Sequence, residues 1–199
     1  MSLSHAPQAV RVEGLTRAFD GRVVIDDLRL DIGQGEFVAL VGPRGCGKST
    51  LLRILAGLDR DLRGTVLVPR RKALAALEPR TRPRPWKGNG RQTSLARVVA
   101  REPDLLLLDD PFGALDARAR AKARHLVGEL WQRRGCAVLL ATSDVEEAVL
   151  LADRVLVMDQ GVIAYETAVG LDRPRDRTGP RFAALRAGLL ARLGTEPAA

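Results

Sequence analysis

The chain has 199 residues and a formal net charge of +8, with 46% apolar and 28% charged residues. This composition is typical of a globular domain with its own hydrophobic core, and it excludes a disordered chain. No apolar stretch approaches the roughly 18 residues that span a bilayer. Residues 1–10 also lack the basic region and apolar run of a signal peptide, so we expect a cytoplasmic protein.

The chain is predicted to begin with two strands of a small antiparallel sheet. Residues 9–15 and 23–32 alternate apolar and polar positions, as half-buried strands do. Phe37–Val41 is a fully apolar strand, and a glycine-rich run at residues 42–47 separates it from a helix at residues 48–58. This order of strand, loop and helix is the context in which a phosphate-binding loop occurs.

The middle of the chain is strongly basic, since residues 60–101 hold 12 Lys and Arg against 2 Asp and Glu. We expect a short strand at residues 65–68 and a helix at residues 91–101, but residues 69–90 show no clean periodicity. Such a patch could meet nucleic acid or anionic lipid. Trp86 is its only aromatic residue, which is too few for a base-stacking surface. We therefore favour a solvated, poorly ordered segment and expect no nucleic-acid partner.

The second half of the chain alternates apolar strands with helices. This alternation predicts an α/β fold, in which a mainly parallel sheet is covered by helices on both faces. A break at residues 172–180 divides a main domain, residues 1–170, from a C-terminal linker and amphipathic helix, residues 171–199. The predicted strands cover residues 105–109, 137–141, 154–159 and 162–166, and the helices cover residues 117–134 and 145–151. The apolar face of the last helix carries Phe182, Leu185, Leu189, Leu190 and Leu193.

One stretch fits the phosphate-loop pattern G-x-x-x-x-G-K-[ST] in full. Glycines let backbone N–H groups approach phosphate oxygens, and the following helix directs its positive dipole end at the same anion. Lys48 is placed to reach the β- and γ-phosphates of ATP, whereas Arg44 either supplies an extra cation or points outward. The residues predicted to bind the nucleotide are Gly42, Pro43, Arg44, Gly45, Cys46, Gly47, Lys48, Ser49 and Thr50.

Asp109 supplies the second half of the predicted site. It ends the apolar strand 105–109, and a carboxylate at the end of a buried strand beside a phosphate loop can hold Mg²⁺ through water. The Ser49 hydroxyl is the second expected metal ligand. We therefore predict ATP and Mg²⁺ as the cofactors.

Three stretches, residues 36–58, 105–116 and 137–160, together resemble the ATP-binding proteins of ABC transporters. The resemblance implies a P-loop ATPase fold. It also implies that Pro111–Asp116 joins two ATPase subunits across their nucleotides, and that Phe19 stacks on adenine.

The subgroup is visible at Pro85–Lys87 and at residues 173–182, which are similar to the importer ATPases for sulfonates, nitrate and taurine, most of all those for aliphatic sulfonates. The resemblance implies a homodimer that docks on integral membrane permease subunits at the inner face of the cell membrane. It implies only indirect contact with a periplasmic or extracellular substrate-binding protein.

The chain departs from this family in its middle. Lys48 and Asp109 are only 61 positions apart, several dozen fewer than in the family, so the helical subdomain is expected to be reduced to roughly residues 69–90. Leu77 stands where the family has the glutamine that senses the γ-phosphate. The signature LSGGQ is reduced to Lys87–Arg91 or lost.

Two candidate catalytic residues also differ from the family. Asp110 stands where the resemblance implies the glutamate that orients the attacking water, and Ser143 where it implies a histidine. Aspartate keeps the negative charge on a side chain one methylene shorter, whereas serine cannot carry a positive charge to phosphate.

Three functional hypotheses follow. The first is an ATPase subunit that powers sulfonate import, and the second is a degenerate subunit that binds ATP but hydrolyses and couples it poorly. A basic nucleic-acid-binding protein is a distant third. An internal deletion or a local frameshift in the gene would also explain the shortened middle.

Overall fold

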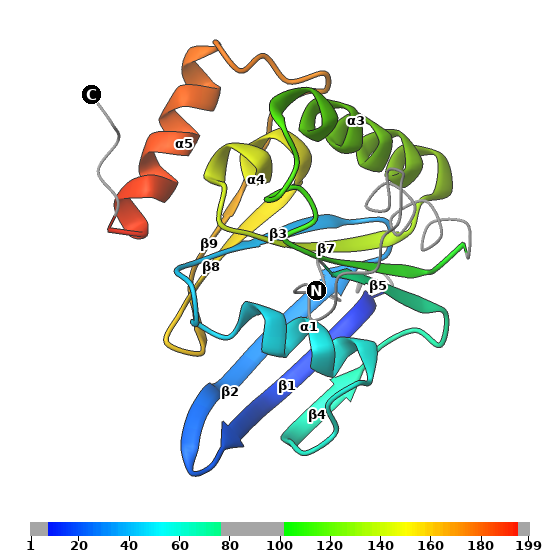
Figure 1. Ribbon diagram of the computed structural model, residues 1–199, viewed down its shortest axis with the longest axis vertical. Helices are drawn as coiled ribbons and strands as arrows, with labels where there is room; N and C mark the ends of the chain where they lie inside the picture. Colours follow the sequence, from blue (N-terminus) through cyan, green and yellow to red (C-terminus); the bar gives the residue numbers. More distant parts are fainter. Residues whose placement is uncertain (1–7, 77–101, 195–199) are drawn as a thin grey trace, which may run out of the picture.

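A computed structural model describes residues 8–76 and 102–194 of the chain (Figure 1). Its strands are β1 (Gln8–Phe19), β2 (Arg22–Gly33), β3 (Phe37–Val41), β4 (Arg63–Leu67), β5 (Lys72–Ala76), β6 (Leu105–Asp109), β7 (Ala137–Thr142), β8 (Arg154–Asp159) and β9 (Val162–Ala168). Its helices are α1 (Lys48–Ala56), α3 (Ala117–Arg134), α4 (Val145–Leu151) and α5 (Pro180–Arg192). Within these described ranges, no helix combines the length and apolar character needed to cross a bilayer.

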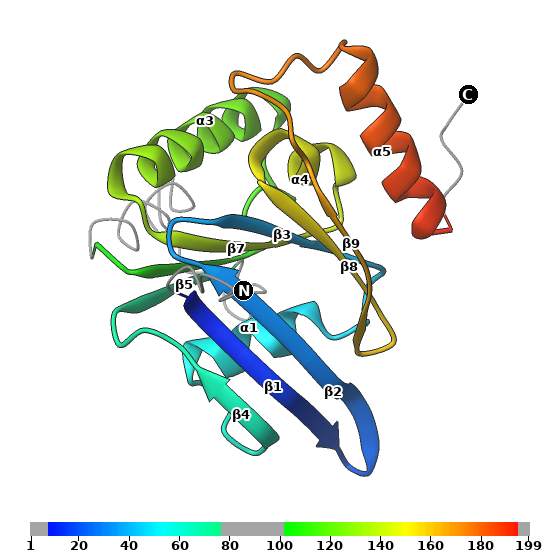
Figure 2. The ribbon, with the colours of Figure 1, turned by 180° about the vertical axis from the view of Figure 1, so that it is seen from behind.

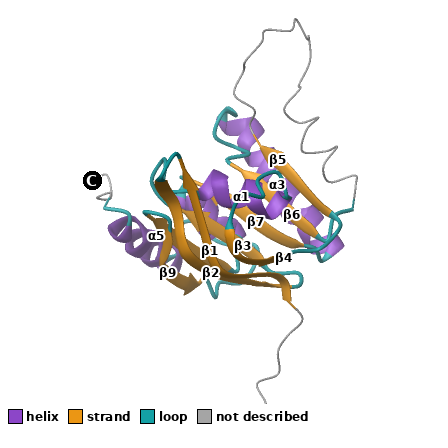
Figure 3. Ribbon diagram, turned by 90° about the horizontal axis from the view of Figure 1, so that it is seen from below, coloured by secondary structure: helices purple, strands orange, loops and turns teal. Residues whose placement is uncertain are grey.

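A six-stranded sheet with the order β5-β6-β7-β3-β8-β9 forms the centre of the molecule. Neighbours from β5 to β8 pair in parallel, and β9 pairs antiparallel with β8. A separate three-stranded antiparallel sheet has the order β2-β1-β4. Figure 3 shows the large sheet running from β9 at one side of the molecule to β5 at the other. The predicted α/β class, with its mainly parallel sheet and small N-terminal antiparallel sheet, is confirmed.

The large sheet is covered on both faces. Helices α3 and α4 lie on one face, whereas α1 and the small sheet lie on the other (Figures 1 and 2). Along β3, Phe37, Ala39 and Val41 pack into the core under α3 and α4. Val38 and Leu40 pack into the second core, which contains the apolar side chains of α1 and the small sheet. Alternate side chains of a strand point to opposite faces, so a strand covered on both sides has to be apolar throughout.

The start of β8 is linked to the small sheet by Arg154. Its Nε atom donates to Glu36 Oε1 over 2.7 Å, and a terminal guanidinium nitrogen donates to the Asp31 carbonyl in β2 over 2.6 Å. Another nitrogen of the same side chain reaches Glu166 Oε2 in β9 at 3.3 Å. One planar guanidinium thus fixes the position of β2 relative to the large sheet.

Strand β5 was missed by the sequence analysis. It pairs with β6 inside the range where no clean periodicity is visible and where the reduced helical subdomain was expected. Its sequence, Lys-Ala-Leu-Ala-Ala, has low strand propensity, and as an edge strand it needs only one neighbour, so local patterning is weak. Predictions for Leu77, Trp86, the remnant at Lys87–Arg91 and the helix at residues 91–101 lie outside the described residues.

Several predicted boundaries shift by a few residues. The first helix ends at Ala56 rather than residue 58, because Gly57 takes a left-handed conformation and its N–H bonds to Ile54 O. The last helix, α5, buries Phe182 and Leu189 in the core under α3 and α4, and its other leucines pack partly buried against the same core. The apolar face predicted for α5 is therefore confirmed, whereas the division of the chain at residue 170 stays a prediction.

Phe37 tests the core beneath α3. Its side chain is 0% exposed and meets Trp131 edge to face, with 5.6 Å between ring centroids. We expect Phe37→Ala to lower the free energy of unfolding by about 3–5 kcal/mol, since it removes a buried ring and leaves a cavity. Phe19→Ala, at a ring that is 42% exposed, is the matched control, with an expected loss below about 1 kcal/mol. Equal losses of unfolding free energy for the two variants, measured by urea denaturation, would contradict the placement of Phe37 in the buried core.

Candidate functional site

The candidate site lies where three parallel strands end side by side. The register pairs Val41 of β3 with Thr142 of β7, and Asp109 of β6 with Ala141 of β7. The carboxyl ends of these strands therefore meet at one edge of the sheet, which is where ligands bind in open α/β folds. Each strand leads directly into residues that the sequence analysis singled out.

A pocket of about 230 Å³ opens at this edge. It brings together residues from the phosphate loop, from the end of β6 and from the end of β7, which lie far apart in the sequence. Its lining comprises Val24, Arg44, Gly45, Gly47, Lys48, Ser49, Thr50, Asp109, Asp110, Ala141, Thr142 and Ser143. Gly42, Pro43 and Cys46 belong to the same loop but do not line the pocket.

Two glycines are required by the shape of the loop. A Cβ on Gly42 would lie 2.2 Å from Met158 O, so only hydrogen fits there. Gly47 has a φ of +112° and caps the start of α1, and a Cβ on it would lie 2.9 Å from Val24 O. Both positions let the loop pass close to β8 and β2 before α1 begins. The open N-terminus of α1 faces the pocket with its positive dipole end.

Lys48 and Ser49 are the first residues of α1. Lys48 Nζ donates to Gly42 O over 2.7 Å and to Pro43 O over 2.9 Å, so the loop carbonyls hold the ammonium group. Ser49 Oγ donates to Asp109 Oδ1 over 3.0 Å. This hydroxyl and this carboxylate, the two residues predicted to hold Mg²⁺, are therefore adjacent across the pocket.

Asp110 lies in the same pocket with an unusual backbone. Its φ is +44°, and its N–H donates to Ala141 O over 2.8 Å, which anchors the end of β6 to β7. Aspartate tolerates the left-handed conformation better than most residues. A Cβ on Gly113 would lie 2.5 Å from Asp110 Oδ2, so the carboxylate occupies the space that glycine leaves free. Gly113 thereby helps to set where the Asp110 carboxylate lies.

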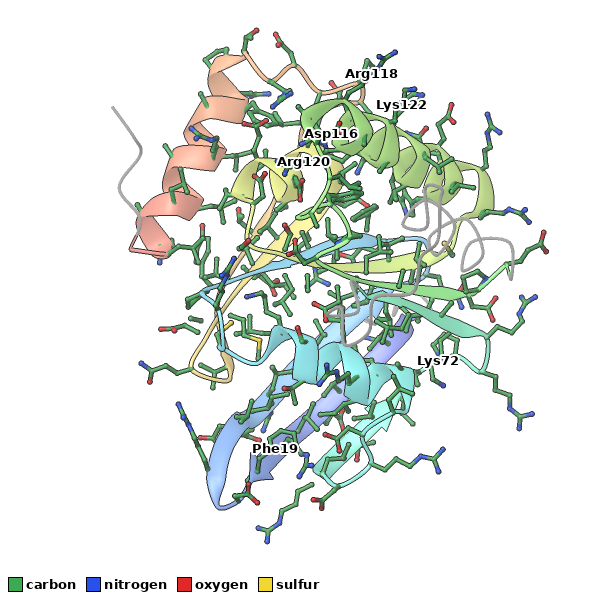
Figure 4. All side chains as sticks on the ribbon, viewed as in Figure 1. Phe19, Lys72, Asp116, Arg118, Arg120 and Lys122 are labelled. Atoms are coloured by element: carbon green, nitrogen blue, oxygen red, sulfur yellow. The ribbon has the colours of Figure 1, made fainter. Side chains whose placement is uncertain are left out.

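Phe19 lies apart from this pocket. It ends β1 at the far end of the small sheet from α3 (Figure 4), and the Arg17 guanidinium covers its ring at 3.9 Å from the centroid. The ring is not among the residues that line the pocket. Its role as the adenine platform stays a prediction.

A buried hydrogen-bond network holds the turn that carries Ser143. Thr142 Oγ1 donates to Glu147 Oε2 over 3.0 Å and accepts from the Asp144 N–H over 3.0 Å. Asp144 in turn caps α4, accepting from the N–H groups of Glu146 and Glu147. The network fixes the backbone on both sides of Ser143, so its position at the pocket wall depends on Glu147.

Glu147 is only 2% exposed and faces two arginines of α3. Arg120 Nε and Arg124 Nη1 each lie 3.9 Å from Glu147 Oε1, and both Nε atoms are buried without a hydrogen-bond partner among the described residues. Burial, together with the nearby Asp144 carboxylate, raises the pKa of Glu147 to about 7, although the Thr142 hydrogen bond and both guanidinium groups oppose the shift. No short sequence motif predicts this network. The available sequence signal was a glutamate in the first turn of the helix predicted at residues 145–151.

Helix α3 begins directly after the predicted subunit-joining loop, Pro111–Asp116. Asp116 caps the helix by accepting from the Ala119 N–H over 2.8 Å. In Figure 4, Arg118 and Lys122 project outward from α3, whereas Arg120 lies toward α4. The first turns of α3 therefore present both an exposed basic side and a side that contacts Glu147.

Comparisons with known proteins agree on the family. A family model described as "ABC transporter" matches residues 25–85. The chain is 61% identical to "Aliphatic sulfonates import ATP-binding protein SsuB 1" of Streptomyces avermitilis, over 98% of this chain and 90% of the relative. It is 50% identical to "Aliphatic sulfonates import ATP-binding protein SsuB 2" of Paracoccus denitrificans, over 94% of this chain and 93% of the relative.

The first of these alignments also shows that this chain is shorter than the relative within the aligned part. It spans 235 positions, whereas 98% of this chain is about 195 residues, so about 40 positions of the relative have no counterpart here. Among solved structures, a dimeric ATP-binding cassette bound to ADP and Pi in a post-hydrolysis state matches with a TM-score of 0.72. The match covers 82% of this chain and 100% of that one at 19% identity, and it shows the shared fold alone.

Glu147 predicts a specific pH dependence of stability. Between about pH 4.5 and pH 7 the folded protein keeps a proton on Glu147 that the unfolded chain releases, so the free energy of unfolding falls as pH rises through this window. Glu147→Gln cannot release that proton, so we expect a smaller fall in urea denaturation between about pH 5 and about pH 7. Glu13→Gln, at an exposed glutamate of β1 that pairs with Arg11, is the control and should keep the wild-type slope. If the free energy of unfolding depended on pH equally in Glu147→Gln and in the wild type, the raised pKa of Glu147 would be refuted.

Proposed function

Because this chain belongs to the ATP-binding proteins of ABC transporters, we propose that it binds and hydrolyses ATP for an importer of aliphatic sulfonates. The single observation that carries the proposal is the pocket in which the phosphate loop, Asp109, Asp110 and Ser143 meet. The sulfonate assignment is supported by the names of two relatives, at 61% and 50% identity.

Nucleotide binding follows from the loop. Its backbone N–H groups and the start of α1 provide the donors and the positive potential that a triphosphate requires. Lys48 Nζ now bonds to two loop carbonyls, and it would exchange these for phosphate oxygens when ATP enters. Such an exchange leaves the ammonium group hydrogen-bonded in both states.

The residues present fit Mg²⁺ as part of the bound nucleotide. Ser49 Oγ and Asp109 Oδ1 are 3.0 Å apart, and both are the hard oxygen ligands that Mg²⁺ prefers. Bound there with phosphate oxygens, Mg²⁺ would neutralise charge on the nucleotide. The end of β6 and the first turn of α1 hold these two oxygens in position to bind the metal.

Hydrolysis draws on the other side of the pocket. In this proposal, the Asp110 carboxylate orients or deprotonates the attacking water. Ser143 adds a neutral hydroxyl, held in place by the network around Glu147. Because Asp110 is short and Ser143 carries no charge, a subunit that binds ATP and turns it over slowly is the second candidate function.

We further propose that two copies of the chain act together at the cytoplasmic face of the membrane, on integral membrane permease subunits. The main domain, residues 1–170, would bind the nucleotide, and a substrate-binding protein would deliver the sulfonate from outside. Contact with the permease would involve the shortened middle of the chain.

Lys48 provides the direct test of nucleotide binding. At a hundredfold excess of ATP and Mg²⁺ over Kd, we expect the free energy of unfolding to rise by about 2.7 kcal/mol. Lys48→Ala should abolish this gain, whereas Lys72→Ala should keep it, because Lys72 lies on β5 away from the pocket (Figure 4). No stabilisation of the wild type would overturn the proposed function. Steady-state phosphate release then separates the two candidates, since binding without turnover would favour the second.

Gly113 tests the placement of the Asp110 carboxylate. A methyl group at this position would force Asp110 Oδ2 to move, because the two would lie 2.5 Å apart. We expect Gly113→Ala to lower the rate of phosphate release on the order of 10²-fold while ATP affinity stays unchanged. Gly188→Ala, which adds a methyl group in open space on α5, is the control. An unchanged rate in Gly113→Ala would show that the position of Asp110 does not matter for turnover.

A further inference from the structure

We propose that Arg44 contacts the terminal phosphate of ATP and makes the pocket prefer a nucleoside triphosphate over the diphosphate. This inference rests on the proposed ATP-binding function. It adds a second cation, beside Lys48, that would contact the phosphate by which the two nucleotides differ.

The charged residues that line the pocket point to Arg44 as the group that would contact the terminal phosphate. Its lining has two cations, Arg44 and Lys48, and two carboxylates, Asp109 and Asp110. Lys48 Nζ is already held by the first two carbonyls of the loop, at Gly42 and Pro43. Lys48 has to exchange these bonds for phosphate oxygens, whereas Arg44 is the lining cation with no hydrogen bond to give up among the described residues.

The Arg44 side chain is free to turn toward a ligand. It is exposed, and across residues 8–76 and 102–194 it makes no side-chain hydrogen bond or ion pair. The neighbouring Gly45 has a φ of +82°, and a Cβ on it would meet no atom within 4 Å. The tip of the loop is thus surrounded by open space, and Arg44 can enter the pocket without displacing another group.

The opposite wall offers no positive charge. It is formed by Thr142 and Ser143, and the Thr142 hydroxyl already donates to Glu147. The terminal phosphate of ATP brings added negative charge close to the carboxylates of Asp109 and Asp110. An arginine can neutralise this added negative charge, because its guanidinium stays protonated and binds phosphate oxygens through two parallel N–H groups.

ADP lacks the phosphate that Arg44 would contact, so loss of Arg44 should weaken ATP binding selectively. We expect Arg44→Ala to raise the Kd of a non-hydrolysable ATP analogue roughly 10-fold, from the loss of a charge-assisted contact. The Kd of ADP should change by less than about twofold. Arg44→Lys should lose less ATP affinity than Arg44→Ala, because it keeps the charge but loses the fork.

The measurement is calorimetric titration of each variant with the ATP analogue and with ADP, both with Mg²⁺. Arg63→Ala is the matched control, since it removes an exposed arginine from β4 outside the pocket. If Arg44→Ala weakened the binding of both nucleotides equally, the effect would be general electrostatics and the inference would be overturned. Unchanged Kd values for both nucleotides would overturn it as well. A wild type that binds neither nucleotide would instead overturn the proposed function, so the two failures are distinguishable.

Discussion

The parallel register of β3, β6 and β7 is the constraint on which the site depends. It brings the residues after Val41, Asp109 and Thr142 to one edge of the sheet, although they come from segments that span about half of the chain. Ser49 Oγ at the start of α1 then lies 3.0 Å from Asp109 Oδ1 at the end of β6. Because both faces of these strands are buried, a slip of register by one residue would move every side chain into the opposite core and disrupt the packing of both, so packing fixes the geometry of the pocket.

The pocket brings like charges close together and contains a strained backbone turn, and both are destabilising by themselves. Two carboxylates, Asp109 and Asp110, lie beside two cations, and the backbone after β6 takes a left-handed turn at φ +44°. These features cost stability, and they are held in place by cores that pack on both faces of the large sheet. The buried Glu147 shows the same principle, because its hydrogen bond to Thr142 orders the pocket wall while its burial makes the charged form costly.

Local sequence signals predicted most of the fold, and they singled out the phosphate loop and Asp109, which the structure brings together in one pocket. The glycine pattern around Lys48 and the apolar strand ending at Asp109 each carry their chemistry in adjacent residues, so one sequence suffices to find them. Strand β5 escaped prediction because alanines in an edge strand give little periodicity. The pairing of Glu147 with Arg120 and Arg124 escaped because it depends on how α3 packs against α4, and no spacing within either helix encodes that contact.

The close approach of Asp110 to Gly113 has a consequence for how this sequence can change over evolutionary time. Lengthening the side chain at position 110 needs the room that position 113 leaves empty, and the 2.5 Å between Oδ2 and the site of a Cβ shows that almost none is spare. The two positions therefore form a pair in which the residue at one restricts what the other accepts. A lineage that acquires a longer acid at position 110 has to keep glycine at position 113, and a lineage that loses this glycine can accept only short side chains at position 110.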